Sequence, residues 1–286
     1  MRIIFIAGPT AIGKTQFALD LAKEITGEII SCDSMQVYRE IRVASNKPSA
    51  EVLKEIPHHL INVVSIEEEF DAARFNRLAL KAIEDIHRRE RTPLVVGGTG
   101  LYMQILLDGI FESKPKNESL REELKEKAKE KGISFLYDIL KIEDPAAAQK
   151  IHPNDLRRII RALEVTRTEK RPFSELQKNR QGLWGKYDIQ IFGLNRPRQE
   201  LYERIEARVE QMFENGLVEE IKSLENRNWS KTAQNIIGVR EVLGYLKKEY
   251  DLKRAKELMK LNTRHLAKKQ LTWFRKDQRI EWIYDL

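Results

Sequence analysis

The octapeptide GPTAIGKT at residues 8–15 constrains the fold of this chain more than any other part of its sequence. It matches the pattern G-x-x-x-x-G-K-[ST] of the phosphate loop, which occurs in ATP-binding and other nucleotide-binding proteins. An apolar, β-branched run at residues 2–7 precedes the loop, and an amphipathic helical stripe at residues 14–26 follows it. A buried strand that enters a helix through such a loop is typical of an α/β protein with a P-loop core.

The loop predicts a binding site for a chain of phosphate groups. Its backbone N–H groups face a bound phosphate, and the following helix adds the positive end of its dipole. Lys14 contributes a positive charge, and Thr15 contributes a hydroxyl ligand for Mg²⁺. The residues expected to bind phosphate are Gly8, Pro9, Thr10, Ala11, Ile12, Gly13, Lys14 and Thr15.

Strand and helix patterns alternate beyond the loop. We expect strands at residues 28–31 and 93–96 with a helix at residues 72–88 between them, and this order predicts a parallel sheet. The strand at 93–96 ends in the tetrapeptide GGTG at residues 97–100. It lacks the carboxylate with which P-loop ATPases hold Mg²⁺ at such a strand end, which counts against a motor or a helicase.

Asp33 follows the strand expected at residues 28–31, which we place beside the strand at residues 2–7. Ligands of doubly wound sheets bind at the carboxyl ends of the strands, so Asp33 should lie near the molecule that carries the phosphates. From its position alone, Asp33 is a candidate general base, Mg²⁺ ligand or substrate clamp. The structural alternative is an aspartate that only caps a turn.

The sequence changes in character after residue 112. Residues 113–186 begin with a segment rich in Lys and Glu and continue as helical patterns, whereas residues 188–194 alternate like a strand that rejoins the sheet. We therefore expect a helical insertion domain at residues 113–186. The P-loop core would then comprise residues 1–112 and 187–286.

Positive charge is concentrated in two segments of the chain. Lys and Arg total 51 against 44 Asp and Glu, a net charge of +7, yet residues 1–112 sum to −3. Residues 151–186 sum to +5 and residues 253–286 to +6. Such segments are either solvated charged faces or phosphate contacts of a nucleic-acid-binding protein.

Helical spacing assigns faces within these two segments. Leu156, Ile159, Ile160 and Leu163 form one apolar face, so the side chains of Arg157, Arg158 and Arg161 should lie together on the exposed side. Trp273 also falls at helical spacing among apolar residues. An aromatic residue in that setting is usually part of the core, and we expect this of Trp273.

The chain shows no signal for a membrane or for an oxidising compartment. The apolar run at residues 3–7 is far shorter than a membrane span and lacks the features of a signal peptide. The only cysteine, Cys32, cannot form an internal disulfide. We expect a cytoplasmic protein, and nothing in the sequence requires more than a monomer.

Five segments together resemble the bacterial tRNA dimethylallyltransferases, also called tRNA isopentenyltransferases. The segments are GPTAIGKT at 8–15, DSMQVYR at 33–39, VGGTGLY at 96–102, HPND with RRIIRALEV at 152–165, and KKQLTWFR at 268–275. They follow one another in the order of the family and extend over nearly the whole chain. The phosphate loop alone is unspecific, whereas its combination with DSMQVYR and Q-x-T-W-F-R is highly specific.

The resemblance implies transfer of a dimethylallyl group from dimethylallyl diphosphate to N6 of an adenosine in tRNA, with release of diphosphate. The implied target is the adenosine 3′ of the anticodon in tRNAs that read U-initial codons. Mg²⁺ is the implied cofactor. The target base would be flipped into a channel through the core, and the insertion domain would grip the anticodon stem.

The resemblance also implies the roles of individual residues. Asp33 matches the catalytic base, Arg208 the arginine that faces the diphosphate, and Thr15 the Mg²⁺ ligand. The positions that match tRNA contacts are Asp33, Ser34, Met35, Gln36, Thr99, Arg121, Arg157, Arg158, Ile159, Ile160, Arg161, Arg240, Lys268, Lys269, Gln270, Leu271, Thr272, Trp273, Phe274 and Arg275. Val239 departs from the family, which often has Tyr at that position.

Three other classes of protein share part of this pattern. A small-molecule P-loop kinase would explain the loop and Asp33, but it would not need the two basic segments. An enzyme that prenylates free adenine nucleotides would not need residues 113–186. An RNA-binding protein without activity would need neither an intact loop nor Asp33.

Overall fold

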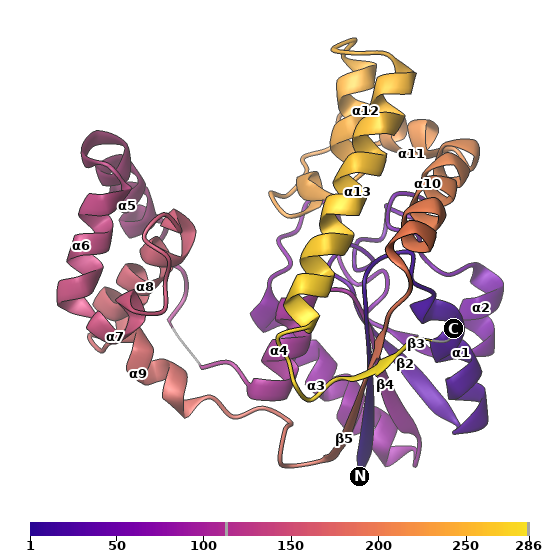
Figure 1. Cartoon of the computed structure of the whole chain (residues 1–286), viewed down its shortest axis with the longest axis horizontal. Coiled ribbons are helices and arrows are strands. Elements are labelled where there is room, and N and C mark those ends of the chain that lie inside the picture. The colour runs from indigo at the N-terminus through magenta and orange to yellow at the C-terminus, as the bar shows by residue number, and fades with distance from the viewer. Residues whose placement is uncertain (112–113, 285–286) are drawn as a thin grey trace. The chain divides into compact units, whose positions relative to one another are not determined.

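The computed structural model describes residues 1–111 and 114–284 (Figure 1). It divides into two compact units, one formed by Met1–Leu107 with Trp184–Leu286 and the other by Asp108–Leu183. The expected domain boundary at 112/113 lies outside the described residues. No helix within the described part of the chain has the length and apolar character needed to cross a membrane.

The first unit contains a parallel sheet in the order β3-β2-β4-β1-β5-β6. The strands are β1 (Arg2–Ala7), β2 (Gly27–Cys32), β3 (His58–His59), β4 (Thr92–Gly97), β5 (Asp188–Leu194) and β6 (Glu281–Ile283). The predicted α/β class and the four predicted strands are confirmed. The short strands β3 and β6 are additions that no sequence period could reveal.

The predicted neighbour of the first strand is wrong. β4 lies between β1 and β2, and its residue Val96 pairs with Ile6 on one side and with Ser31 on the other. The chain skips one position after β1 and fills it later with β4. Because all three strands are parallel, their carboxyl ends still meet at one edge of the sheet, so Asp33 remains near the phosphate loop.

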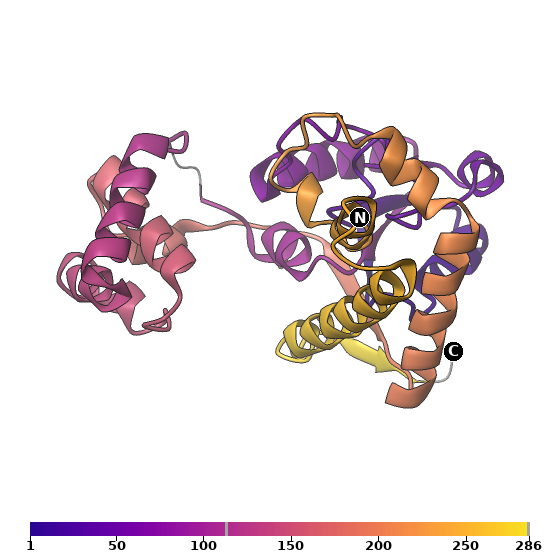
Figure 2. The same cartoon turned by 90° about the horizontal axis from the view of Figure 1, so that it is seen from above.

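Helices cover this sheet and extend beyond it (Figures 1 and 2). They are α1 (Lys14–Glu24), α2 (Ala50–Glu55), α3 (Ala72–Arg88), α4 (Gly100–Asp108), α10 (Arg198–Glu214), α11 (Leu217–Ser223), α12 (Val239–Leu246) and α13 (Leu252–Phe274), with a 3₁₀ turn at Ala233–Asn235. The buried face of α1, including Ala18 and Ala22, packs against Ile4, Ile29 and Leu94 of the sheet. α10 and α13 pack side by side.

The second unit is a helical bundle with its own core. Its helices are α5 (Glu118–Lys131), α6 (Ile133–Glu143), α7 (Pro145–Ala148), α8 (Leu156–Glu169) and α9 (Phe173–Leu176), followed by a 3₁₀ turn at Gln177–Asn179. Leu124 of α5, Leu136 and Leu140 of α6, and Ile159 and Leu163 of α8 are all fully buried against one another. The unit therefore has the closed apolar interior of a small domain.

Candidate active site

The phosphate loop connects β1 to α1 and has the tight backbone that its glycines allow. Gly13 has φ 112°, and the non-glycine residue Ala11 has φ 64° in the left-handed region. The Nζ atom of Lys14 donates to the carbonyl oxygens of Gly8 at 2.9 Å and Pro9 at 2.7 Å. Burial lowers the pKa of Lys14 to about 8, and the nearby Asp33 carboxylate opposes this shift.

A cavity of about 730 Å³ opens at this loop. Its lining combines the loop, the residues that follow β2, the residues that follow β4, and one face each of α10 and α13. The predicted site residues that it brings together are Thr10, Ala11, Ile12, Gly13, Lys14, Thr15, Asp33, Ser34, Met35, Gln36, Thr99, Arg208, Lys269, Gln270 and Trp273. The carboxyl edge of a parallel sheet is where such a site is expected.

Asp33 both caps a turn and lines the cavity, so its position fits both interpretations. Its Oδ1 accepts a hydrogen bond from the N–H of Met35 at 2.8 Å, which is the turn-capping contact. Burial lowers the pKa values of Lys14 and Arg208, and the same Asp33 carboxylate, which lines the cavity, partly opposes this lowering. Asp33 therefore stabilises its loop and places a negative charge beside Lys14 and Arg208.

The end of β4 holds the loop that carries Asp33. Thr99 donates its N–H to the carbonyl of Cys32 at 3.2 Å, and its Oγ1 accepts from the N–H of Ser34 at 3.1 Å. Asp33 lies between these two partners. Thr99 is thus hydrogen-bonded to Cys32 and Ser34, the residues before and after Asp33. These two bonds fix the position of Asp33 relative to the end of β4.

Helix α10 presents two arginines to the phosphate loop, one helical turn apart. Arg208 donates from Nη1 to the hydroxyl of Thr10 at 3.1 Å, and burial lowers the pKa of this guanidinium. Arg204 donates from Nε to the carbonyl of Ala11 at 2.9 Å. The sequence prediction missed Arg204, although its i, i+4 spacing from Arg208 puts both on one helix face.

A second arginine that the prediction missed precedes α10. Arg196 donates from Nε to the carbonyl of Ile12 at 3.1 Å and pairs with Glu200 at 2.6 Å. Arg196 and Arg204 therefore bond consecutive carbonyls of the loop, and Arg204 also lines the cavity. Hydrogen bonds to these carbonyls do not occupy N–H groups of the loop, and N–H groups at the start of a helix can bind a phosphate.

The prediction that Trp273 belongs to the core is wrong. Its side chain is 39% exposed and lines the cavity at the end of α13. A Cβ atom on Gly100 would overlap the indole ring, so the ring rests directly on the backbone at the start of α4. Exposed aromatic side chains are surfaces on which a planar base can stack.

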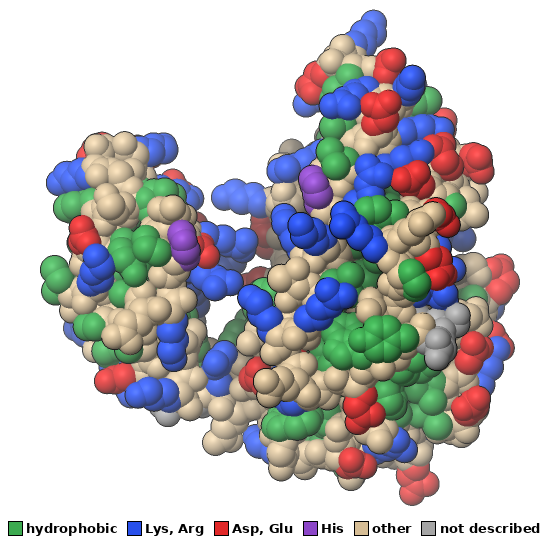
Figure 3. All heavy atoms as spheres, viewed as in Figure 1, with side chains coloured by type: hydrophobic (Ala, Val, Ile, Leu, Met, Phe, Trp, Pro, Cys, Tyr) green, Lys and Arg blue, Asp and Glu red, His purple; other side chains and the backbone are tan. Residues whose placement is uncertain are grey.

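The remaining residues of the predicted C-terminal contact divide into two groups. The side chains of Lys268, Thr272 and Arg275 are exposed, and Lys and Arg side chains gather over α13 (Figure 3). Leu271 packs against the apolar core, and Phe274 is buried. The side chain of Phe274 is therefore not available to a tRNA, which corrects the prediction at this position.

In the second unit, two of the predicted arginine contacts are exposed. Arg157 and Arg158 lie on the exposed side of α8, and Arg158 pairs with Asp155 at 3.3 Å. Ile159 and Ile160 are buried in the core of the bundle, so the prediction that these side chains touch tRNA is wrong. Apolar residues on the inner face of an amphipathic helix cannot reach a ligand outside it.

Arg161 and Arg121 have a structural task that the sequence pattern did not reveal. Arg161 donates to Glu164 at 2.9 Å and Arg121 donates to the same carboxylate at 2.8 Å. Glu164 is 2% exposed, and a buried carboxylate needs such partners. Of the three arginines that we expected on the exposed side of α8, Arg157 and Arg158 are exposed. Arg161 is half-buried and forms an ion pair with Glu164.

Val239, the residue at which this sequence departs from the family, is the first residue of α12. Val239 is fully buried in the core, whereas Arg240 is exposed. A valine at 239 therefore fills space between helices. Arg240 keeps the exposure that a phosphate contact requires.

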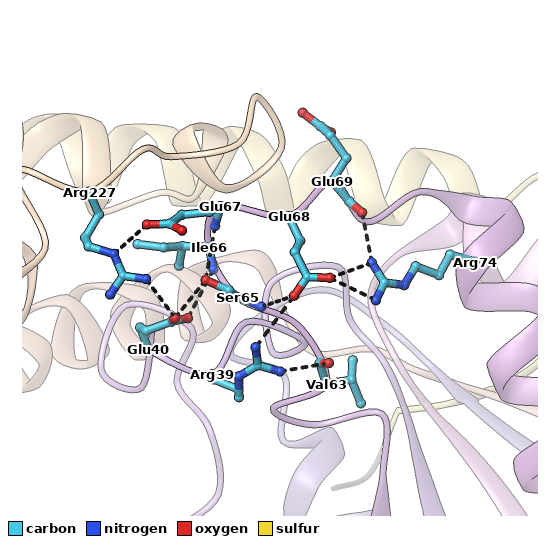
Figure 4. Close-up of polar contacts among 10 residues, drawn as sticks. All are labelled: Arg39, Glu40, Val63, Ser65, Ile66, Glu67, Glu68, Glu69, Arg74 and Arg227. Carbon is cyan, nitrogen blue, oxygen red and sulfur yellow. Dashed lines mark hydrogen bonds and ion pairs between the residues drawn. The ribbon is translucent and has the colours of Figure 1, made fainter.

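A charged network supports the segment between Asp33 and α3 (Figure 4). Arg74 donates to Glu68 at 3.1 Å, and Glu40 accepts from the hydroxyl of Ser65 at 2.9 Å. Arg227, from the residues after α11, donates to Glu67 at 2.6 Å. Among the described residues the cavity lining contains none of these side chains, so we assign the network to stability of the fold.

The donor set of the cavity fits one Mg²⁺ ion. Thr15 lines the cavity and supplies a hydroxyl oxygen, and the phosphates of a bound substrate would supply further ligands. No cluster of three or more His, Cys, Asp or Glu is found within residues 1–111 and 114–284. Mg²⁺ needs no such cluster, because it usually keeps several waters and binds through one or two protein oxygens and the phosphates of a substrate.

Fold and cavity together define a P-loop protein in which the loop, a carboxylate and an aromatic ring line one cavity. Residues 36–277 match the family model described as IPP transferase. The tRNA dimethylallyltransferase of Halothermothrix orenii is 43% identical over 284 residues, which covers 98% of this chain and 87% of that protein. The tRNA dimethylallyltransferase 2 of Geotalea uraniireducens is 44% identical over 285 residues, with 99% and 92% covered.

Solved structures agree with this assignment. The tRNA isopentenylpyrophosphate transferase of Bacillus halodurans is 39% identical with a TM-score of 0.72, covering 99% of this chain and 89% of that chain. A eukaryotic dimethylallyltransferase, solved acting on tRNA, is 33% identical with a TM-score of 0.85 and covers 99% and 73%. The chain therefore belongs to the IPP transferase family, and the resemblance to tRNA dimethylallyltransferases is confirmed.

Proposed function

We propose that this chain transfers the dimethylallyl group of dimethylallyl diphosphate to N6 of the adenosine 3′ of the anticodon in tRNA. The observation that carries the proposal is the cavity itself. It sets the carboxylate of Asp33 beside the phosphate loop, Lys14 and Arg208 in one space. The names of the relatives at about 43% identity support the same reaction.

The carboxylate of Asp33 compensates for the low nucleophilicity of the adenine amine. The lone pair of the exocyclic amine of adenine is delocalised into the ring, so the amine is a poor nucleophile. Asp33 accepts a proton from N6 as the new C–N bond forms, and a general base in this role accelerates a reaction by roughly 10²–10⁴-fold. The bond from the allylic carbon to the diphosphate oxygen breaks, and its electron pair leaves with the diphosphate.

The cations and N–H groups of the loop stabilise the departing diphosphate. Negative charge grows on the leaving oxygen as the allylic carbon detaches, and preorganised donors lower the energy of that state. Lys14 and Arg208 supply positive charge. The loop supplies backbone N–H groups, and its carbonyls at Ile12 and Ala11 accept from Arg196 and Arg204. A bound Mg²⁺ would add charge neutralisation, held by Thr15 and the diphosphate.

The target base must leave its stack to reach this cavity, as in other enzymes that act on a base. The indole of Trp273 supplies a surface for stacking at the cavity. The exposed cations Lys268 and Arg275 of the α13 end, and Arg157 and Arg158 of α8, suit contacts with the phosphate backbone. We assign the helical unit to the anticodon stem. All these residues come from one chain, so a monomer suffices.

The competing function is a P-loop kinase that uses ATP. The two are separated by following both reactions, release of diphosphate from dimethylallyl diphosphate and transfer of the γ-phosphate of ATP with release of ADP, in the presence and absence of tRNA. We expect diphosphate release that requires tRNA and Mg²⁺. Transfer of the γ-phosphate of ATP, with no tRNA-dependent diphosphate release, would contradict the proposal. Diphosphate release with free adenosine monophosphate in place of tRNA would favour the nucleotide prenyltransferases instead.

A further inference from the structure

Gln270 lies on α13, within the segment that the family resemblance assigns to tRNA contacts. Its side-chain amide is bonded at both ends to the backbone of the protein. The Oε1 atom accepts from the N–H of Thr10 at 2.9 Å, and Nε2 donates to the carbonyl of Gly98 at 3.0 Å. These bonds occupy one acceptor and one donor of the amide inside the core unit.

The two partners of Gln270 belong to the two halves of the active site. Thr10 is part of the phosphate loop, and its hydroxyl accepts from Arg208 at 3.1 Å. Gly98 directly precedes Thr99, which is bonded to Cys32 and Ser34 on either side of Asp33. The amide of Gln270 therefore joins the loop that binds the leaving group to the loop that carries the base.

The backbone at residue 98 is shaped to receive this amide. A Cβ atom on Gly98 would overlap Nε2 of Gln270, so only glycine leaves room for the bond. The φ angle of Gly98 is not in the left-handed region, so backbone strain does not explain the glycine. The close approach of Gln270 does explain it.

We propose that Gln270 is a positioning residue that sets the spacing between the phosphate loop and the Asp33 loop, and that it does not contact tRNA. This inference rests on the proposed prenyl transfer. It assigns the effect of Gln270 to the use of dimethylallyl diphosphate, through Thr10 and Gly98. A tRNA contact at the same residue would instead affect the dissociation constant for tRNA.

Gln270→Glu tests the two hydrogen bonds through pH. A protonated carboxyl group can accept from Thr10 and donate to Gly98 as the amide does, whereas an ionised one cannot donate and places a negative charge near the diphosphate. We expect kcat/KM for dimethylallyl diphosphate to be about 10- to 100-fold below wild type at about pH 8. The ratio to wild type should rise as the pH falls towards about 5.5, because the part-buried setting of residue 270 raises the pKa of a carboxyl above its ordinary value of about 4.3 and so brings protonation into this range.

Two further variants and one control complete the test. Gln270→Leu should lose the same activity at every pH, and Gly98→Ala should reproduce that loss with Gln270 still present, because the new methyl group displaces the amide. Gln199→Glu makes the same chemical change at an exposed glutamine of α10 and should leave both substrates unaffected. The dissociation constant for tRNA should stay at the wild-type value in all four variants.

The possible outcomes separate this inference from the proposed function. Wild-type protein that transfers no dimethylallyl group would overturn the function, and the inference with it. Active wild type with a pH-independent ratio for Gln270→Glu would overturn the inference alone. Weakened tRNA binding with an unchanged KM for dimethylallyl diphosphate would also overturn it, because Gln270 would then be a tRNA contact. If Gln270→Glu fails to fold, Gly98→Ala and Gln270→Leu still test the inference. A lower kcat/KM for dimethylallyl diphosphate with an unchanged dissociation constant for tRNA would support it, and the reverse would overturn it.

Discussion

At the scale of single residues, Asp33 performs two tasks with one carboxylate. Oδ1 is bonded to the N–H of Met35, which holds the turn, and the carboxylate also lines the cavity beside Lys14 and Arg208. An amide in place of the carboxylate keeps an oxygen for the turn and loses the basic group. The two tasks can therefore be separated by one substitution.

We predict that Asp33→Asn lowers the turnover of dimethylallyl transfer by roughly 10²–10⁴-fold, because the proton of N6 loses its acceptor. The measurement is kcat at saturating concentrations of both substrates, together with the dissociation constant for tRNA, which should not change. Asp138→Asn, at an exposed position of α6, is the matched control. Wild-type turnover in Asp33→Asn would exclude Asp33 as the base.

Lys14 gives a second prediction at this scale, because its charge depends on pH in the working range. Burial lowers its pKa to about 8, so the side chain is an ammonium group below that pH and a neutral amine above it. The affinity for dimethylallyl diphosphate should therefore fall as the pH rises from about 7 to about 9.5, by up to about tenfold per pH unit above the pKa. Direct binding measurements across this range check the step.

Lys14→Met supplies the control for the pH prediction. This variant should bind dimethylallyl diphosphate more weakly than wild type at about pH 7, because it lacks the positive charge. Its affinity should not show the decline above about pH 8. The same decline in both proteins would assign the titration to another group.

At the scale of elements, α10 supports the phosphate loop through two arginines that also line the cavity. Arg204 bonds the carbonyl of Ala11, a non-glycine residue in the left-handed region, and Arg208 bonds the hydroxyl of Thr10. A left-handed alanine is unfavourable unless its surroundings hold it. The helix thus supplies both a support for the backbone of the loop and a cation for its ligand.

We predict that Arg204→Ala raises the KM for dimethylallyl diphosphate by about 10- to 100-fold, because the carbonyl of Ala11 loses a charged donor. Arg204→Lys should recover only part of the loss, since an ammonium group cannot reproduce the Nε geometry. Steady-state kinetics with each substrate varied in turn measure the effect. An unchanged KM in Arg204→Ala would show that the loop keeps its shape without this bond.

Helix α8 carries two exposed arginines, Arg157 and Arg158, that we assign to tRNA binding, and one arginine, Arg161, that pairs with the buried Glu164. We predict that alanine at both 157 and 158 weakens tRNA binding and lowers the slope of log Kd against log salt by about 0.7–0.9 for each phosphate that is no longer neutralised. Thermal stability should not change, because both side chains are exposed. An unaltered salt slope would remove this face of α8 from the tRNA interface.

Arg161→Ala should have the opposite effect. It removes one of the donors to the buried Glu164, so the free energy of unfolding of the helical unit should fall by about 1–3 kcal/mol. Urea denaturation measures this change. A loss of tRNA affinity at full stability would return Arg161 to the group of phosphate contacts.

At the scale of the whole molecule, the sequence predicts which segments are strands better than it predicts how they pair. The apolar runs at 2–7 and 93–96 are strands because a buried parallel strand is apolar on both faces. Their order in the sheet depends on crossovers that leave no local pattern, so the position of β4 between β1 and β2 could not be predicted. β3 and β6 are too short to show a period.

The site residues that belong to a local motif could be predicted from the sequence. The residues whose side chains bond a backbone group far away in the sequence could not. The loop and Asp33 follow from local sequence. The bonds of Arg204 to Ala11 and of Gln270 to Thr10 and Gly98 join residues more than 170 positions apart. Trp273 shows the same limit, since helical spacing does not tell which face of α13 meets the cavity and which meets the core.

Prenylation of an adenosine of tRNA is the central property that we assign to this molecule, and mass analysis of digested tRNA nucleosides tests it most directly. Unmodified tRNA is incubated with the protein, dimethylallyl diphosphate and Mg²⁺, with Asp33→Asn in parallel. We expect wild type to convert the adenosine 3′ of the anticodon to its N6-dimethylallyl form and the variant to do so far more slowly. Unmodified nucleosides after incubation with folded wild type would contradict this assignment.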